Sequence, residues 1–151
     1  MHRQSIAKPI VIATLVCGSL DILWAMILTL WRRKQIDAML RFVASGPFPS
    51  ATDMGTAGSL LGLAVHYTLM AIMVGAFVLA ARSWPSLLNQ PWIAGVIYGL
   101  ITYVVMNLIV VPVRFPTAWP PTMLSITTQL FSHIVLVGWP TAFIARRYLR
   151  G

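Results

Sequence analysis

The stretch GTAGSLLGLAVHYTLMAI, residues 55–72, decides the fold, because it holds no charged residue and a single histidine, His66. Apolar residues continue to Ala81, which makes the run long enough to cross the roughly 30 Å hydrocarbon core of a bilayer as a helix. The whole chain has the same character: 58% of its 151 residues are hydrophobic and 9% are charged. Soluble domains carry about 25% charged residues. We therefore expect an integral membrane protein.

Three further apolar stretches have a similar length, and the four predicted spans are residues 9–31, 55–81, 92–113 and 122–146. The first is too long for the hydrophobic region of a signal peptide and no small-residue cleavage site follows it, so we expect it to be retained. The connections after the second and third spans are short and contain proline, which favours antiparallel neighbours. The sequence predicts one all-α membrane domain, residues 1–151, with four transmembrane helices in an antiparallel bundle.

The connection between the first two spans contains a short amphipathic segment at about residues 34–45. Its apolar residues recur at helical spacing, and Asp37 and Arg41 lie four residues apart on the opposite face. This pattern is typical of a helix that lies in the membrane interface. Such a helix either covers the bundle as a lid or only anchors the chain, and both alternatives stay open.

The net charge of +8 comes from basic residues that gather where the spans end. That placement favours attraction to a bilayer with anionic headgroups and gives no reason to expect nucleic acid as a partner. The residues are Arg32, Arg33, Lys34, Arg146, Arg147 and Arg150. The single cysteine, Cys17, lies inside the first span, which excludes a disulfide framework and a cysteine-based zinc site within one chain.

Polar residues inside the spans carry the functional information, since an ionisable group in hydrocarbon is costly and is usually partnered or functional. Each span supplies one to the predicted central layer: Asp21, His66, Asn107 and His133. At 1.5 Å per residue, Asp21 and the two histidines fall within about 3 Å of their span midpoints, and Asn107 within about 8 Å. Tyr103 and Gln129 lie on the same helical stripes. We expect Asp21 to orient or charge one histidine.

Two G-x-x-x-G pairs share these stripes: Gly58 with Gly62, and Gly95 with Gly99. Small residues let membrane helices approach closely. The pairs predict that the second and third spans pack backbone to backbone beside the polar layer. The alternative use is dimerisation of the whole bundle, which leaves a homo-oligomer open.

Three interpretations fit the polar layer. In the first it is a hydrogen-bonded cluster that fixes helix register. In the second it holds a ligand: Asp21, His66 and His133 form a metal set suited to Zn²⁺ or Fe²⁺, and two opposed histidines suit a haem, although no H-x-x-x-H spacing or axial-ligand motif is present. In the third it handles protons, because burial disfavours the charged forms of carboxylic acid and imidazole alike.

Several segments together resemble a family. RFVASGPF, GTAGSLLGLAVHYTLMAI, GVIYGLITYVVMNLIVVPV and SHIVLVGWPTAFIARRY, within residues 36–148, are similar to a widespread family of uncharacterised small bacterial four-span inner-membrane proteins. The resemblance implies a coherent four-span unit and no particular activity, cofactor or partner. The chain departs from the family pattern around Asp53, Met54 and the proline-rich SGPFPS, which bears on the lid alone.

The sequence thus favours a multi-pass protein of the bacterial inner membrane that binds a small ligand, metal or haem, or handles protons, at its midplane. The alternative is a structural accessory or assembly subunit that docks onto a larger membrane complex through its glycine stripes and aromatic interfaces. No catalytic triad order, phosphate-cradling loop or nucleotide fingerprint occurs, so nothing in the sequence demands an enzyme.

Overall fold

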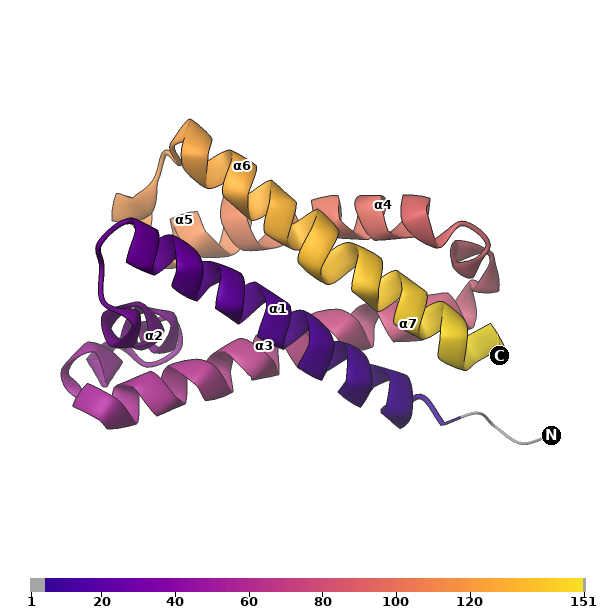
Figure 1. The fold of residues 1–151 in the computed structure, drawn as a ribbon, viewed down its shortest axis with the longest axis horizontal. Coiled ribbons are helices and arrows are strands. Elements are labelled where there is room, and N and C mark those ends of the chain that lie inside the picture. Colours follow the sequence, from indigo (N-terminus) through magenta and orange to yellow (C-terminus); the bar gives the residue numbers. More distant parts are fainter. Residues whose placement is uncertain (1–4, 151) are drawn as a thin grey trace.

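The computed structural model describes residues 5–150, and almost all of this part of the chain is helical, with no strand (Figure 1). Four helical segments are long and apolar enough to cross a membrane. They are α1 (Ala7–Trp31), α3 (Gly55–Ser83), Pro91–Arg114 and Met123–Arg150. Each end lies within four residues of the predicted boundary, so the expectation of an all-helical chain with four membrane-length helices is confirmed.

The last two spans are continuous helices with a wider π-helical segment in the middle. The third consists of α4 (Pro91–Tyr103), η3 (Val104–Val110) and α5 (Val111–Arg114), and the fourth of α6 (Met123–Phe131), η5 (Ser132–Gly138) and α7 (Trp139–Arg150). Each π segment ends two residues before a proline, Pro112 or Pro140. A proline lacks its own N–H and crowds the carbonyl four residues earlier, and a wider turn relieves that crowding.

The segment after α1 forms the expected short helix, α2 (Ile36–Ser45). Its apolar side buries Leu40 and Ala44, and its outer side carries an ion pair between Arg41 Nη1 and Asp37 Oδ2 at 2.8 Å. Arg114, at the end of α5, donates hydrogen bonds to the Ser45 and Gly46 carbonyls. The C-terminal end of α2 is therefore held by the third span. The other connections are the short helices η1 (Pro49–Asp53), η2 (Pro85–Leu88) and η4 (Pro116–Ala118).

The first glycine pair packs α3 against α2 and the loop that follows it. A Cβ atom on Gly62 would overlap the Leu40 carbonyl, and one on Gly58 would overlap the Ala51 carbonyl oxygen. α2 therefore rests directly on the backbone of α3. The prediction that this pair faces the third span is wrong.

The second glycine pair packs α4 against the fourth span. A Cβ atom on Gly95 would lie 2.6 Å from Trp139 Cδ1, and one on Gly99 would lie 2.6 Å from the His133 carbonyl oxygen. Gly138 meets the Gly95 carbonyl from the other side. The predicted backbone packing of the second and third spans is corrected accordingly, because a stripe of small residues indicates close approach without specifying the partner helix.

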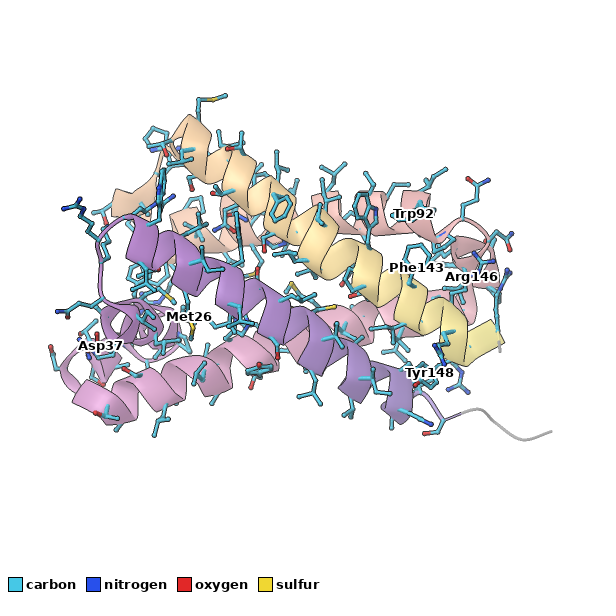
Figure 2. All side chains as sticks on the ribbon, in the orientation of Figure 1. Met26, Asp37, Trp92, Phe143, Arg146 and Tyr148 are labelled. Atoms are coloured by element: carbon cyan, nitrogen blue, oxygen red, sulfur yellow. The ribbon has the colours of Figure 1, made fainter. Side chains whose placement is uncertain are left out.

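The two ends of the molecule differ in packing. The start of α1 and the end of α7 lie at one end, with Arg146 and Tyr148, whereas α2 with Asp37 and the start of α6 lie at the other (Figures 1 and 2). The main apolar core, which includes Met70, Val74 and Phe77, lies toward the end with the chain termini. By contrast, α6, η3 and α5 bury no residue.

Candidate functional site

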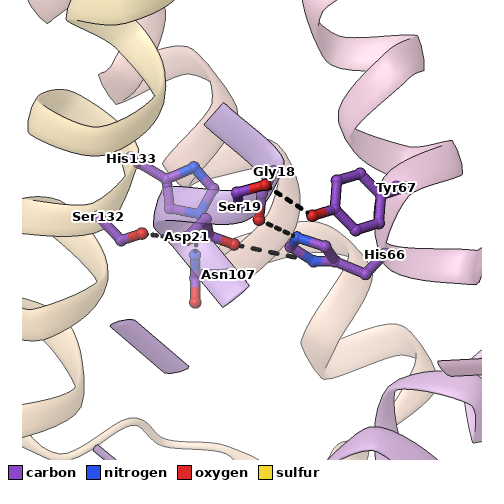
Figure 3. A network of polar contacts seen from close by, with 8 residues as sticks. All are labelled: Gly18, Ser19, Asp21, His66, Tyr67, Asn107, Ser132 and His133. Atoms are coloured by element: carbon purple, nitrogen blue, oxygen red, sulfur yellow. Dashed lines mark hydrogen bonds and ion pairs between the residues drawn. The ribbon is translucent and has the colours of Figure 1, made fainter. Parts of the chain in front are cut away.

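Asp21 and His66 face each other between α1 and α3 (Figure 3). His66 Nδ1 lies 3.9 Å from Asp21 Oδ2, and His66 Nε2 lies 2.9 Å from the Gly18 carbonyl oxygen. A carbonyl can only accept, so Nε2 carries a hydrogen and donates it. Nδ1 is therefore the ring nitrogen that faces the carboxylate.

A third helix reaches the same carboxylate. The Ser132 hydroxyl, on η5, donates a hydrogen bond to Asp21 Oδ1 (Figure 3). Ser132 is buried, whereas the side chain of Asp21 is 28% exposed and that of His66 is 11% exposed. Asp21 thus joins α1, α3 and the fourth span, and part of it remains open to its surroundings.

Tyr67 lies beside His66 and links α3 to α1 a second time. Its hydroxyl lies 2.8 Å from Ser19 Oγ, and its ring meets the His66 ring edge-on at 5.4 Å between centroids. The absence of a side chain at Gly18 makes this possible, because a Cβ atom there would lie 2.7 Å from Tyr67 Cε1. Sequence reasoning missed the roles of Gly18, Ser19 and Tyr67, although the adjacency of Gly18 and Ser19 to Asp21 and of Tyr67 to His66 was a signal.

His133, on η5, forms a separate set of hydrogen bonds. Its Nδ1 lies 3.0 Å from Thr102 Oγ1, which itself donates to the Gly99 carbonyl at 3.0 Å. Its Nε2 lies 3.2 Å from Asn107 Nδ2. Since the amide nitrogen only donates, Nε2 accepts and Nδ1 carries the hydrogen. The arrangement fixes the tautomer of the His133 ring.

The predicted four-residue layer is therefore two pairs. Asp21 pairs with His66, and Asn107 pairs with His133; Ser132 links them, because it bonds Asp21 and precedes His133 in the chain. Tyr103 contacts the His133 ring edge-on, with centroids 6.0 Å apart. Gln129 is half-buried, and its side-chain amide has no hydrogen-bond partner among residues 5–150.

The donor set does not fit the predicted metal or haem. Within residues 5–150, no group of three or more His, Cys, Asp or Glu side chains is placed to hold a metal ion. The set of Asp21, His66 and His133 is not assembled, because both ring nitrogens of His133 are turned to Thr102 and Asn107. The same bonds remove His133 as an axial ligand opposite His66.

No known protein family matches the chain, and neither do curated proteins or solved structures. The resemblance to the bacterial four-span family stays a prediction.

Proposed function

We propose that this chain is a multi-pass protein of the bacterial inner membrane in which the Asp21–His66 pair takes up and releases a proton. In this proposal the four spans form an antiparallel bundle, and α2 lies in the interface with Asp37 and Arg41 toward the headgroups. The short link between α3 and α4 and the position of the start of α1 and the end of α7 at the same end of the molecule support the bundle (Figure 1).

The observation that carries the proposal is that one added proton has two positions in this geometry, His66 Nδ1 and Asp21 Oδ2. With His66 doubly protonated, Nε2 donates to Gly18 and Nδ1 faces an ionised Asp21. With the proton on Asp21, Nδ1 becomes the acceptor and Nε2 keeps its bond. No helix has to move for the proton to change sites.

The distance between His66 and Asp21 sets how far their side chains must move for a proton to pass between them. The 3.9 Å between Nδ1 and Oδ2 exceeds hydrogen-bond length, and an approach of about 1 Å by either side chain closes the gap. Separated charges are costly in hydrocarbon, yet a facing opposite charge and the Ser132 hydroxyl offset part of that cost. In this proposal the pair, with a neutral His66 ring and an ionised Asp21, takes up one proton from outside, holds it on either group and releases it again.

The experiment is infrared difference spectroscopy of the protein in bilayers, recorded as the pH is changed. Asp21 is the only carboxylic acid within a span, so its carbonyl band should appear on acidification and be missing from the Asp21→Asn variant. The matched control is Asp53→Asn, which makes the same chemical change at an exposed residue and should keep the band. Identical difference spectra for Asp21→Asn and the unchanged protein would overturn the proposal and favour a structural cluster or an accessory subunit.

A further inference from the structure

The interior between the Asp21–His66 pair and the chain termini is filled with apolar side chains. Met70, Val74 and Val137 are at most 1% exposed, and Cys17, one helical turn from Asp21, is 0% exposed. Cys17 forms its polar contacts within this half: its Sγ lies 3.3 Å from Thr141 Oγ1 and 3.6 Å from the Val137 carbonyl oxygen. Within residues 5–150, the buried core on this side of Asp21 is thus mostly apolar.

Half-buried polar groups continue toward the other end. Ser125, Gln129 and Ser132 follow at intervals of four and three residues, so they form one stripe along α6 into η5. Ser132 bonds to Asp21 at the inner end of the stripe. Gln129 and Ser125 are half-buried on a helix that buries no residue. At 1.5 Å per residue, the stripe rises about 10 Å from Ser125 to Ser132.

Trp24 borders this stripe one turn from Asp21. Its Nε1 donates to the Thr128 carbonyl at 3.3 Å, and its ring packs against Phe131 with centroids 4.9 Å apart. These contacts hold α1 beside α6 without covering the carboxylate, because the side chain of Asp21 stays 28% exposed.

We infer that protons reach Asp21 from the α2 side of the membrane, along the stripe of Ser125, Gln129 and Ser132, and are excluded from the side of the chain termini. This inference rests on the proposed function and adds its sidedness: the protonation of the pair follows the pH of one compartment. Water is the carrier, and the amide of Gln129 and the hydroxyl of Ser125 are the groups that bind it.

Thr14 supplies the matched control. It lies on α1 toward the termini, and its hydroxyl oxygen is buried without a hydrogen-bond partner among residues 5–150. Thr14 and Gln129 lie at similar depths from the two ends, about 10 Å from the start of α1 and about 9 Å from the start of α6. If both ends were equally open to water, the two positions would react alike.

The test is thiol labelling with a membrane-impermeant reagent, applied to one side at a time of vesicles that contain the full chain. In a Cys17→Ser background, Gln129→Cys and Ser125→Cys report the stripe and Thr14→Cys reports the sealed half. Ser50→Cys, at an exposed residue after α2, identifies the side on which α2 lies. We expect Gln129→Cys and Ser125→Cys to label from the same side as Ser50→Cys, and Thr14→Cys to label from neither.

Two outcomes would overturn the inference. One is labelling of Thr14→Cys from the termini side at the rate of Gln129→Cys. The other is protection of both stripe positions while Ser50→Cys labels, which would mean that lipid covers α6. Labelling does not depend on titration of Asp21. Normal labelling with an unchanged Asp21→Asn infrared spectrum would therefore reject the proposed function and keep the access path.

Discussion

His66 and His133 lie in one polar region of the spans, yet their surroundings differ in the property that decides protonation. In His133, Nδ1 faces the Thr102 hydroxyl and Nε2 faces the Asn107 amide nitrogen, which donates. A second ring proton, on Nε2, would therefore point at a donor and find no acceptor. His66 has one nitrogen fixed by a backbone carbonyl and the other turned to a carboxylate. In our proposal, the partner of the second ring nitrogen separates a structural histidine, His133, from one that exchanges a proton, His66.

The largest effect is expected at the close approach that builds the His133 side of this comparison. Gly99→Ala would put a Cβ atom 2.6 Å from both the His133 carbonyl oxygen and Ile134 Cα. Backbone atoms cannot yield as a flexible side chain can, so we expect a loss of about 3 kcal/mol of unfolding free energy. Denaturation of the detergent-solubilised protein measures it.

Gly75→Ala is the matched control for this substitution, because a Cβ atom there meets nothing within 4 Å. We expect its stability to be equal to or slightly above that of the unchanged protein. A similar loss for both variants would show that the contact of α4 with η5 is not what makes Gly99 necessary.

A smaller effect should separate the two histidines directly. His133→Phe removes one hydrogen-bond partner from the buried Thr102 and one from the half-buried Asn107, which costs about 2 kcal/mol. His66→Phe removes one hydrogen bond to a carbonyl and costs about 1 kcal/mol. Thermal unfolding of the two variants side by side gives the order. A greater loss for His66→Phe would reverse the roles assigned to the two residues.

The smallest effect is expected from Asp37, the exposed carboxylate that contrasts with Asp21. The hydrogen bond from Arg41 holds the pKa of Asp37 below its usual range. The contribution of the Asp37–Arg41 pair to the stability of α2 is therefore complete at pH values above the usual pKa range of aspartic acid. It is lost only as the pH falls through the lowered pKa of Asp37. Hydrogen exchange should show that the α2 amides become slightly less protected in acid. The Asp37→Asn variant should not show this change with pH. Loss of protection already near neutral pH would contradict this assignment.

The spans were predictable because their length is fixed by the thickness of the bilayer, which a run of apolar residues must match. The partners of the helices were not. Lipid-facing and protein-facing surfaces are both apolar, so the sequence does not show which helix packs against which. Gly58 and Gly62 predict a close approach but do not identify α2 as the partner helix. The π segments were also missed, although Pro112 and Pro140 mark the ends of both.

The ionisable residues of the candidate site could be predicted from the sequence, but its hydroxyl-bearing residues could not. Asp21, His66 and His133 stand out because charge is expensive in hydrocarbon. Hydroxyl residues do not, since most of them can bond to a carbonyl of their own helix, as Thr68 does with Ala64 at 2.7 Å and Thr29 with Ala25 at 2.7 Å. Ser132 and Thr102 therefore look ordinary in the sequence, although Ser132 bonds to Asp21 and Thr102 bonds to His133.

Nitrogen nuclear magnetic resonance of the histidine rings in bilayers tests the central claim most directly. With signals assigned through His66→Gln, His133→Gln and His2→Gln variants, the account predicts that the His66 ring changes between singly and doubly protonated forms as the pH is lowered. His133 should keep a single Nδ1–H tautomer throughout that change. A His66 ring that never titrates, or a His133 ring that titrates before it, would contradict the account.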